Sequence, residues 1–569
     1  MGYRQQSDPH TRNGEWTGHI SHICFIGAGY VGGPTAAVIA SRCPDVQVTV
    51  VDRNVERIKA WQSDELPVCE PDLLDVVKFA RDWQKNLHFT TQLEESIKIA
   101  DAIVISVDTP TKARGGGSGY ALDTARFEEV AISIANFAET DKIVVEKSTV
   151  PVGTGQIIRK VLEANACKGV KFEVLSNPEF LAEGTAVQNL RFPDRILIGS
   201  LKTQSGLLAA EALSDVYATW VPRAHIITIN LFSAELSKFA ANALLAQRIS
   251  SMNALSVICE ATGANVQEVA QAVGSDKRIG PHMLRSSFGF GGSCFKKDIK
   301  SLVYLCKSIH LDDIAAYWES VLTINTNQKL RSVARIVSRF NNNMEGKIIA
   351  VLGFSFKENT ADTRETCAID LVNGLLREGA RVNIYDPWVR EQQIYGDLGI
   401  NKDDSLLKVC GSGEEACGGA HAVLVATNWD QFRVIPQTPA MSSCVNGADG
   451  GPGADSVAAT AGSSGVATPS SSSTKSTNVP NRVSDVFEQD RCGLLENGFK
   501  THVSSSITFG TAGNCNRSAG VENAFLDWNH LAKVMKLPRF VYGSGACLDR
   551  AVLENMGFEV EIIGSQRQY

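Results

Sequence analysis

Short apolar runs alternate with helical patterns in the first part of the chain, from Ile20 to about Lys147. The pattern predicts strands at residues 22–26, 46–51, 102–107 and 143–145, and a helix at residues 33–41. Strands that alternate with helices are typical of right-handed βαβ crossovers. This part of the chain is therefore predicted to form a parallel sheet covered by helices.

The apolar pattern continues in one long helix and a second α/β region. Residues from Phe232 to about Thr262 contain neither Pro nor Gly and predict a helix of roughly 45 Å, at 1.5 Å per residue. Further strands are predicted at 347–353, 381–385 and 422–426, a helix at 367–378, and more α/β elements at 525–563. The fold is thus predicted to be α/β, with two Rossmann-like doubly wound domains joined by a long central helix.

The periodic pattern is lost between residues 438 and 522. Residues 447–480 are mostly Gly, Ser, Ala and Thr. Such a composition cannot bury enough apolar surface to compensate for the entropy lost on ordering. We therefore expect a disordered, low-complexity insertion within the second α/β domain.

Composition and charge exclude several classes of protein. The 569 residues are 44% hydrophobic and 21% charged, and the net charge is −7. No basic domain suggests nucleic-acid binding, and no run of 18 apolar residues suggests a membrane span. The polar N-terminus lacks the apolar core of a secretory signal, so a cytoplasmic protein is expected. The 14 cysteines include no C-x-x-C pair, so mostly reduced thiols and no metal site are expected.

A glycine motif lies between the first predicted strand and the first predicted helix. Gly27, Gly29 and Gly32 form G-x-G-x-x-G, and Asp52 follows 20 residues after Gly32. Such glycines let a pyrophosphate approach the backbone, and the acidic residue binds the adenosine ribose, which favours NAD over NADP. Arg53 and Arg57 could instead hold a 2′-phosphate. The simpler alternative is a glycine turn in an α/β fold that binds no dinucleotide.

Three further segments end predicted strands. Residues 107–111 and 147–151 follow two strands, where an open parallel sheet binds its ligands, although both could be ordinary turns. In residues 176–184, Glu179 and Glu183 are four residues apart, a spacing that places both on one face of a helix. Taken alone, this segment is expected to be a helix N-terminus with acidic residues in its first turn.

Lys238 and Asn242 are polar residues four apart on the otherwise apolar long helix. A lysine in such a place extends to solvent, pairs with a partner, or takes part in chemistry. A polar pair that faces an interdomain cleft and a solvated stripe are both consistent with this pattern.

The segment 289–298, Gly-Phe-Gly-Gly-Ser-Cys-Phe-Lys-Lys-Asp, is the strongest local signal. Its glycines let the backbone approach a ligand, and Cys294 follows them directly. Neighbouring lysines would favour the thiolate, and Asp298 lies one helical turn further on. The pattern is typical of a nucleophilic cysteine with an acid or base partner, whereas a buried structural cysteine is the simpler alternative.

Taken in order, these motifs resemble the UDP-glucose 6-dehydrogenase family of nucleotide-sugar dehydrogenases. The resemblance includes residues 354–364, covers about 20–432, and resumes near residue 525. It implies that UDP-glucose is oxidised at C6 to UDP-glucuronate with two NAD⁺, by a cytoplasmic enzyme that self-associates as a dimer or a higher homo-oligomer. Two alternatives stay open: a dehydrogenase of another nucleotide sugar, and a weakly active paralogue with a binding or regulatory role.

The resemblance also implies roles for individual residues. Cys294 would capture the aldehyde as a thiohemiacetal, which a second hydride transfer converts to a thioester. Lys238 and Asp298 would handle protons and stabilise oxyanion character, and Glu179 and Thr149 would place the hydrolytic water. The implied cofactor contacts are Gly27, Ala28, Gly29, Tyr30, Val31, Gly32, Asp52, Arg57, Val107, Thr109, Pro110, Thr111, Ser148, Thr149, Glu183, Lys297 and Arg364. The implied substrate contacts are Glu179, Phe180, Leu181, Ala182, Glu183, Lys238, Asn242, Arg278, Arg285, Phe288, Gly289, Phe290, Gly291, Phe356 and Lys357, of which Arg278 would reach the substrate of a neighbouring subunit.

The resemblance divides the chain into five parts. These are a disordered tail at 1–19, an NAD-binding Rossmann-like domain at 20–231, a central helical dimerisation domain at 232–340, a UDP-sugar-binding Rossmann-like domain at 341–437 plus 523–569, and the insertion at 438–522. Two positions depart from the family pattern. Asp108 replaces an Asn, and Gly545 replaces the Arg of an Asp-Gly-Arg motif that contacts the substrate. We therefore expect the affinity for the UDP-sugar to differ from that of the family.

Overall fold

The computed structural model describes residues 11–12, 15–16, 18–167, 169–434 and 525–565. The expected insertion at 438–522 and most of the expected N-terminal tail lie outside these residues. A two-stranded antiparallel pair, β1 (Thr11–Arg12) and β2 (Glu15–Trp16), precedes the first domain.

The first sheet has eight strands in the order β10-β9-β8-β7-β6-β3-β4-β5. Its strands are β3 (His22–Ile26), β4 (Gln47–Val51), β5 (Leu87–Thr90), β6 (Ala102–Ile105), β7 (Lys142–Glu146), β8 (Phe172–Ser176), β9 (Ile196–Ser200) and β10 (Ile226–Asn230). Strands β3 to β8 are parallel, but β9 pairs antiparallel with β8. The parallel sheet predicted for residues 20–147 is confirmed, whereas β9 lies beyond that range, and an apolar run does not encode the direction of a strand.

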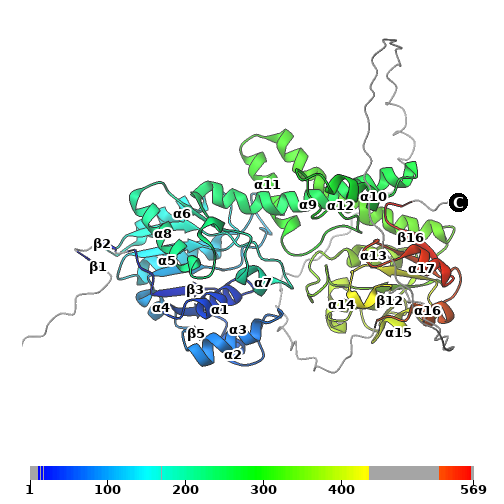
Figure 1. Cartoon of the computed structure of the whole chain (residues 1–569), viewed down its shortest axis with the longest axis horizontal. Helices are drawn as coiled ribbons and strands as arrows, with labels where there is room; N and C mark the ends of the chain where they lie inside the picture. The colour runs from blue at the N-terminus through cyan, green and yellow to red at the C-terminus, as the bar shows by residue number, and fades with distance from the viewer. Residues whose placement is uncertain (1–10, 13–14, 17, 168, 435–524, 566–569) are drawn as a thin grey trace, which may run out of the picture. The chain divides into compact units, whose positions relative to one another are not determined.

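Helices cover both faces of this sheet (Figure 1). They are α1 (Gly32–Arg42), α2 (Val55–Gln62), α3 (Leu73–Lys78), the π-helix η1 (Phe79–Gln84), α4 (Leu93–Ile99), α5 (Ala125–Phe137), α6 (Thr154–Asn165), α7 (Ala186–Arg191), α8 (Gln204–Ala218) and the 3₁₀-helix η2 (Arg223–His225). Successive side chains of a strand point to opposite faces. Accordingly, Ile23 and Phe25 join the core under α1, α3 and α8, whereas Cys24 and Ile26 join the core under α4, α5 and α6. The sheet is therefore buried on both sides.

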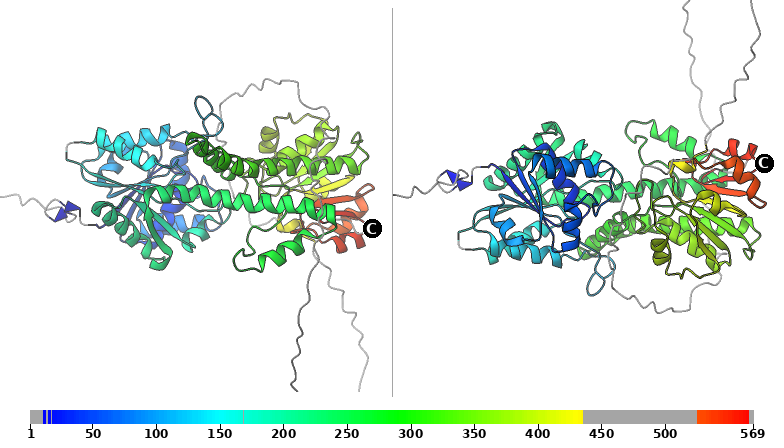
Figure 2. Two further views of the ribbon diagram at one scale, coloured as in Figure 1. Left: turned by 90° about the horizontal axis from the view of Figure 1, so that it is seen from above. Right: turned by 90° about the horizontal axis from the view of Figure 1, so that it is seen from below.

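Four helices follow the first sheet, namely α9 (Leu231–Thr262), α10 (Val266–Gly274), α11 (Phe295–Ser308) and α12 (Asp312–Arg339). Helix α9 is the predicted long helix, and Figure 2 shows it as one continuous element. The Asn230 side chain caps its start, and Gly263 ends it at a φ of +81°. Helices α9, α11 and α12 pack against one another around a core that includes Ala243 and Ile299. Residues on α9 and α11 are therefore brought into contact.

The second sheet is wholly parallel, in the order β13-β12-β11-β14-β15-β16. Its strands are β11 (Ile348–Leu352), β12 (Arg381–Tyr385), β13 (Leu407–Val409), β14 (Ala422–Val425), β15 (Phe540–Gly543) and β16 (Glu559–Ile562). Its helices are α13 (Cys367–Arg377), α14 (Glu391–Leu398), α15 (Gly413–Cys417), the 3₁₀-helix η3 (Asp430–Phe432), α16 (Trp528–Val534) and α17 (Arg550–Asn555). Residue Ala422 of β14 pairs with Phe540 of β15, so the last α/β elements complete the same sheet. The predicted fold class is confirmed.

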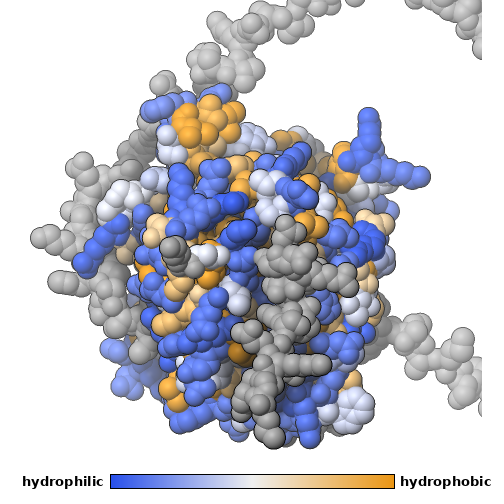
Figure 3. Space-filling model, turned by 90° about the vertical axis from the view of Figure 1, so that its left-hand side faces the viewer, coloured by the Kyte–Doolittle hydropathy of each residue, from blue (hydrophilic) through white to orange (hydrophobic). Residues whose placement is uncertain are grey.

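Hydrophilic residues predominate on the face of the molecule shown in Figure 3. None of the helices that the structure describes is long and apolar enough to cross a membrane. Ten cysteines among the described residues carry free thiols.

Candidate active site

The three motif glycines lie between β3 and α1, and each has a different neighbourhood. A Cβ atom on Gly27, whose φ is +111°, would lie 2.6 Å from the Ser106 carbonyl oxygen. A Cβ on Gly32 would lie 2.0 Å from the Gly27 carbonyl oxygen, whereas a Cβ on Gly29 would meet nothing within 4 Å. Gly27 and Gly32 therefore close the turn, and Gly29 leaves open the space that a pyrophosphate at the start of α1 requires.

Asp52 connects the end of β4 to this turn. One oxygen, Oδ2, accepts hydrogen bonds from the Ala28 amide at 3.0 Å and from Arg57 Nη1 at 3.0 Å. The other, Oδ1, accepts from the Asn54 amide at 2.9 Å. The carboxylate is thus fixed beside the glycine turn, and the Arg57 guanidinium lies against it.

The strand-end segments after β6 and β7 are bonded to each other. Thr109 Oγ1 donates to the Thr149 carbonyl oxygen at 2.7 Å, and Ser148 Oγ donates to the Val107 carbonyl oxygen at 2.6 Å. The structure therefore brings these predicted cofactor residues to one edge of the sheet. Asp108, which replaces the family's Asn, is exposed and lies 4.0 Å from Arg126.

Glu179 and Glu183 do not lie on a helix, so that prediction was wrong. The chain from 177 to 185 is irregular, and α7 begins only at Ala186. Side chains bind the amides that a helix would use: Glu179 accepts from the Phe180 amide at 2.7 Å, and Asn189 Oδ1 accepts from the Ala182 amide at 3.0 Å. Glu70 accepts from the amides of Gly184 and Ala186. These contacts direct the two glutamates to different partners.

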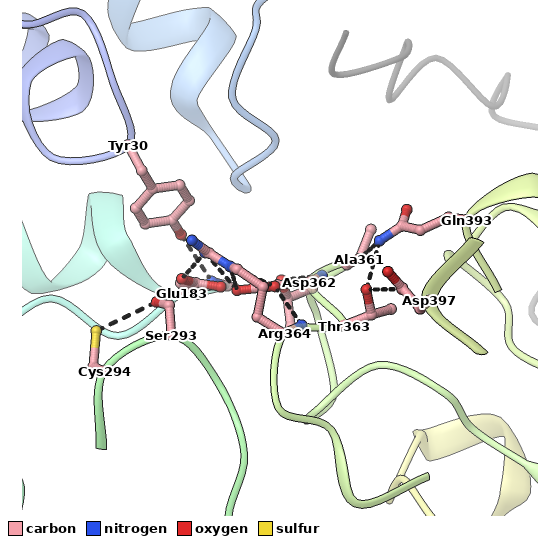
Figure 4. Close-up of polar contacts among 12 residues, drawn as sticks. Tyr30, Glu183, Ser293, Cys294, Ala361, Asp362, Thr363, Arg364, Gln393 and Asp397 are labelled. Carbon is pink, nitrogen blue, oxygen red and sulfur yellow. Dashed lines mark hydrogen bonds and ion pairs between the residues drawn. The ribbon is translucent and has the colours of Figure 1, made fainter. Parts of the chain in front are cut away.

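Glu183 belongs to a polar cluster shown in Figure 4. Arg364 Nη2 lies 3.3 Å from Glu183 Oε1 and 2.6 Å from Asp362 Oδ2, and the Tyr30 hydroxyl accepts from the Gly184 amide at 3.3 Å. Burial and the charge of Asp362 raise the pKa of Glu183 to about 8. The cluster joins three residues predicted to contact the cofactor, namely Tyr30, Glu183 and Arg364.

Glu179 is held by two lysines. Lys147, which follows β7, places Nζ 2.9 Å from Glu179 Oε2. Lys238 of α9 donates to the Glu179 backbone carbonyl oxygen. Lys238 and Asn242 are buried, with exposed fractions of 9% and 8%, so the solvated stripe is excluded for this pair.

Asn242 continues the cluster toward the cysteine. Its Nδ2 donates to Asp298 Oδ2 at 2.5 Å, and Asp298 is fully buried in the first turn of α11. The Asp298 amide donates to the Cys294 carbonyl oxygen at 2.8 Å. Hydrogen bonds therefore join Lys238 to Glu179, Asn242 to Asp298 and Asp298 to Cys294, and Lys238 and Asn242 lie one turn apart on α9.

Cys294 is exposed at the N-cap position of α11. Its Sγ lies 3.5 Å from Ser293 Oγ (Figure 4). The lysines that follow it in sequence are paired elsewhere, because Lys296 lies 2.7 Å from Glu365 and Lys297 lies 3.3 Å from Asp298. The cations whose charges interact with Cys294 include Lys357 and Arg364, and the positive end of the α11 dipole adds to them.

The glycine loop before Cys294 is fixed from behind by Asn325 of α12. Asn325 Oδ1 accepts from the Phe290 amide at 2.8 Å, and its Nδ2 donates to the Phe290 carbonyl oxygen at 3.1 Å. A Cβ on Gly291 would lie 2.5 Å from the Glu365 carbonyl oxygen. The ring of Phe288 packs edge-on against Tyr542 at 5.3 Å between centroids. These contacts order the loop that is predicted to bind the sugar.

Arg278 and Arg285 are exposed, and no described contact joins them to the other site residues. Arg278 pairs with Asp276 at 2.6 Å. Its expected contact with a neighbouring subunit stays a prediction.

Gly545 is exposed and borders an open hollow of about 430 Å³ that Arg433 and Arg550 also line. A Cβ on Gly545 would lie 2.0 Å from Gln267 Nε2, the mobile end of a side chain. The position can therefore accept a side chain if Gln267 moves.

The predicted site set left out four residues that position its members. Lys147 and Tyr217 lie beside Glu179, Glu70 binds the loop before α7, and Asp362 pairs with Arg364. Lys147 and Asp362 belong to the motifs at 147–151 and 354–364, so the sequence could have indicated them as site residues. Glu70 and Tyr217 lie far from those motifs in sequence, so only the fold reveals them. No group of three or more His, Cys, Asp or Glu suited to a metal occurs within the described ranges.

Two Rossmann-like sheets, an open glycine turn and a cysteine at a helix start define a dinucleotide-dependent dehydrogenase. Family models agree: the UDP-glucose/GDP-mannose dehydrogenase family matches with its NAD binding domain at residues 21–221, its central domain at 232–327 and its UDP binding domain at 350–446. The chain belongs to the UDP-glucose/GDP-mannose dehydrogenase family.

Relatives and solved structures agree with this assignment. UDP-glucose 6-dehydrogenase 3 of Arabidopsis thaliana is 55% identical over 428 residues, which are 73% of this chain and 88% of that protein. UDP-glucose 6-dehydrogenase 1 of Oryza sativa subsp. japonica is 54% identical over 73% of this chain and 89% of that protein. The structure of a UDP-glucose dehydrogenase from Pyrobaculum islandicum is 30% identical, with a TM-score of 0.66 over 73% of this chain and 92% of that one.

Proposed function

We propose that the chain is an NAD-dependent UDP-glucose 6-dehydrogenase that converts UDP-glucose to UDP-glucuronate. The observation that carries this proposal is the cluster around Cys294, in which hydrogen bonds join Lys238 to Glu179, Asn242 to Asp298 and Asp298 to Cys294, with Lys238 and Asn242 one turn apart on α9. It brings together the nucleophile and the candidate acid–base groups that an oxidation with a covalent intermediate uses. Identity of 55% to a UDP-glucose 6-dehydrogenase supports the same substrate.

The residues of the first domain fit NAD. Gly29 faces open space at the start of α1, and Asp52 lies beside the turn with a carboxylate suited to the two ribose hydroxyls. NAD⁺ supplies the hydride acceptor for both oxidation steps. Thr109, Ser148 and Thr149 border the same edge of the sheet and would position it.

The residues around Cys294 would carry out proton transfer, covalent capture and hydrolysis. Lys238 and Asp298 are placed to accept and return the proton of the C6 hydroxyl and to stabilise negative charge on its oxygen. Cys294 adds to the aldehyde carbon, and the resulting thiohemiacetal is oxidised to a thioester. Glu179 and Thr149 place the water that hydrolyses this thioester. Covalent capture keeps the reactive aldehyde in the site.

The remaining candidate contacts are proposed to hold the substrate and the cofactor. Phe180, Leu181, Ala182, Phe288 to Gly291, Phe356 and Lys357 would form the sugar-nucleotide site, and Tyr30, Glu183, Lys297 and Arg364 would contact the cofactor. We also infer self-association through α9, because Leu244, Leu245 and Ile258 are exposed on it. We also propose the five-part division of the chain and a cytoplasmic location, as the family resemblance implies.

A substrate panel tests the proposal. The purified protein is supplied with NAD⁺ and one of UDP-glucose, GDP-mannose or a UDP-N-acetyl-hexosamine, and NADH is followed by absorbance. Two NADH per UDP-glucose are expected. Turnover only with another sugar would identify a different dehydrogenase, and UDP-glucose binding without turnover would identify the weakly active paralogue.

A further inference from the structure

Lys147 is a buried lysine at the carboxyl end of β7, with 4% of its surface exposed. Its Nζ lies 2.9 Å from Glu179 Oε2, donates to Asn177 Oδ1 at 2.9 Å and donates to the Tyr217 hydroxyl at 3.3 Å. The ammonium group thus has two hydrogen-bond acceptors and one ion-pair partner. These three contacts fix the direction of the side chain.

The partners of Lys147 are themselves held in place. The Tyr217 hydroxyl donates to Asn177 Oδ1 at 2.6 Å, and Asn177 Nδ2 donates to the Leu197 carbonyl oxygen at 2.7 Å. These contacts tie the ends of β7, β8 and β9 to helix α8. Buried hydrogen-bond networks restrict the motion of their members, so this one holds the Lys147 cation beside Glu179.

Glu179 is held at both ends by this arrangement. Lys147 binds one carboxylate oxygen, the Phe180 amide binds the other at 2.7 Å, and Lys238 binds the backbone carbonyl. The titratable groups that interact with Glu179 are Lys147 after β7, Tyr217 from α8 and Lys238 from α9. Burial lowers the pKa of Lys147, but the charges and hydrogen bonding of Glu179 and Tyr217 together outweigh it, so the pKa is raised. The lysine therefore stays a cation.

We propose that Lys147 is the positioning residue that places a positive charge beside Glu179 and aims this carboxylate for thioester hydrolysis. This inference rests on the proposed function. In the hydrolysis, the water oxygen bonds to the thioester carbon, the carbon–sulfur bond breaks, and Cys294 regains a thiol. One water proton passes through the Glu179 carboxylate, and no electrons are transferred. Both oxidation steps precede this one and do not need Lys147.

Replacement of Lys147 by Met tests the role. In Lys147→Met, the first turnover should still release two NADH per active site, but steady-state acid formation at pH 7 should fall at least about tenfold. Intact-mass measurement should find the acyl group retained on Cys294. Higher pH should restore hydrolysis, with the pH profile moved up by about 1–3 units, because a carboxylate that loses its cation binds a proton more readily.

Lys142→Met is the matched control, because Lys142 is an equally buried lysine at the other end of β7. Its Nζ donates to the Lys98 and Ala100 carbonyl oxygens at 3.0 and 2.6 Å. This variant should lose stability without retaining an acyl group or moving the pH profile. In a Glu179→Gln background, Lys147→Met should add little further loss, because both changes remove the same step.

The outcomes separate the two proposals. If the wild-type protein forms no acid from UDP-glucose, the proposed function fails. If the wild type forms acid while Lys147→Met hydrolyses at the normal rate, or if Lys142→Met shows the same pH shift, only the role of Lys147 fails. Should Lys147→Met not fold, Tyr217→Phe removes one hydrogen-bond acceptor of Lys147 and should give a smaller loss with a smaller pH shift in the same direction. An unchanged Tyr217→Phe would then overturn the inference.

Discussion

Asn242 on α9 donates a hydrogen bond of 2.5 Å to Asp298 Oδ2 on α11 and so joins the two helices at the active site. Asp298 is fully buried, and its amide bonds back to Cys294 one turn earlier. A carboxylate in such a place requires donors. Asn242 therefore sets both the position and the charge environment of the acid–base group next to the cysteine.

Replacement of Asn242 by Leu leaves Asp298 Oδ2 without this donor. The free energy of unfolding should fall by about 1–3 kcal/mol, the usual cost of an unsatisfied buried polar group. Turnover of UDP-glucose should also fall. Urea unfolding and initial rates measure the two effects. Ser250→Ala on the same helix removes a buried bond to the Val321 carbonyl oxygen and should leave turnover intact. Equal turnover in both variants would contradict this role of Asn242.

The glycine turn gives a prediction with an internal control. Gly29→Ala adds a Cβ in open space, so the melting temperature should not change measurably, but KM for NAD⁺ should rise because the methyl group occupies the approach to the backbone. Gly32→Ala adds a Cβ 2.0 Å from the Gly27 carbonyl oxygen and should cost about 1–3 kcal/mol of stability. An unchanged KM in a stable Gly29→Ala protein would show that the cofactor does not approach there.

Glu183 should make stability depend on pH. Its pKa is raised from 4.5 to about 8 in the folded state, first by burial and then by Asp362. The folded protein therefore holds a proton on this carboxyl that the unfolded chain has lost, so this group's contribution to the free energy of unfolding falls as pH rises from about 4.5 to about 8. Glu183→Gln cannot ionise and should show a shallower decline in urea midpoint between pH 5 and 8. Parallel curves for the two proteins would contradict the assignment.

The missing family Arg at Gly545 gives a gain-of-function test. Gly545→Arg should lower KM for UDP-glucose by up to about fivefold, because a cation in an exposed place contributes at most about 1 kcal/mol. KM for NAD⁺ should stay the same. Gly545→Met controls for the bulk that displaces Gln267. If the Arg and Met variants bind UDP-glucose equally, the charge at this position does not matter.

Local patterns in the sequence predicted much of the fold. Strands β3 (His22–Ile26) and β12 (Arg381–Tyr385) lie where the apolar runs placed them, because polar residues border each run. The direction of β9 and the irregular path of residues 177–185 could not be predicted. Glu70, more than 100 residues earlier in the chain, binds the Gly184 and Ala186 amides there, and that contact exists only in the folded protein.

In the candidate site, too, the sequence predicted some features and not others. The motifs located Cys294, Asp298, Lys238 and Asn242, because each belongs to a short pattern with a chemical reason. They did not show that Lys296 and Lys297 pair with carboxylates. Nor did they show that the positive charges of Lys357 and Arg364 interact with Cys294. Sequence neighbours of a reactive group are easily listed, but its neighbours in space depend on how helices and sheets pack.

Covalent catalysis through Cys294 is the central claim, and Cys294→Ser tests it most directly. With UDP-glucose and excess NAD⁺, this variant should form no UDP-glucuronate, yet it should bind NAD⁺ as the wild type does. Cys167→Ser, which changes another exposed free cysteine, should form acid at the normal rate and yield two NADH per UDP-glucose. Full oxidation of UDP-glucose to the acid by Cys294→Ser would contradict the account.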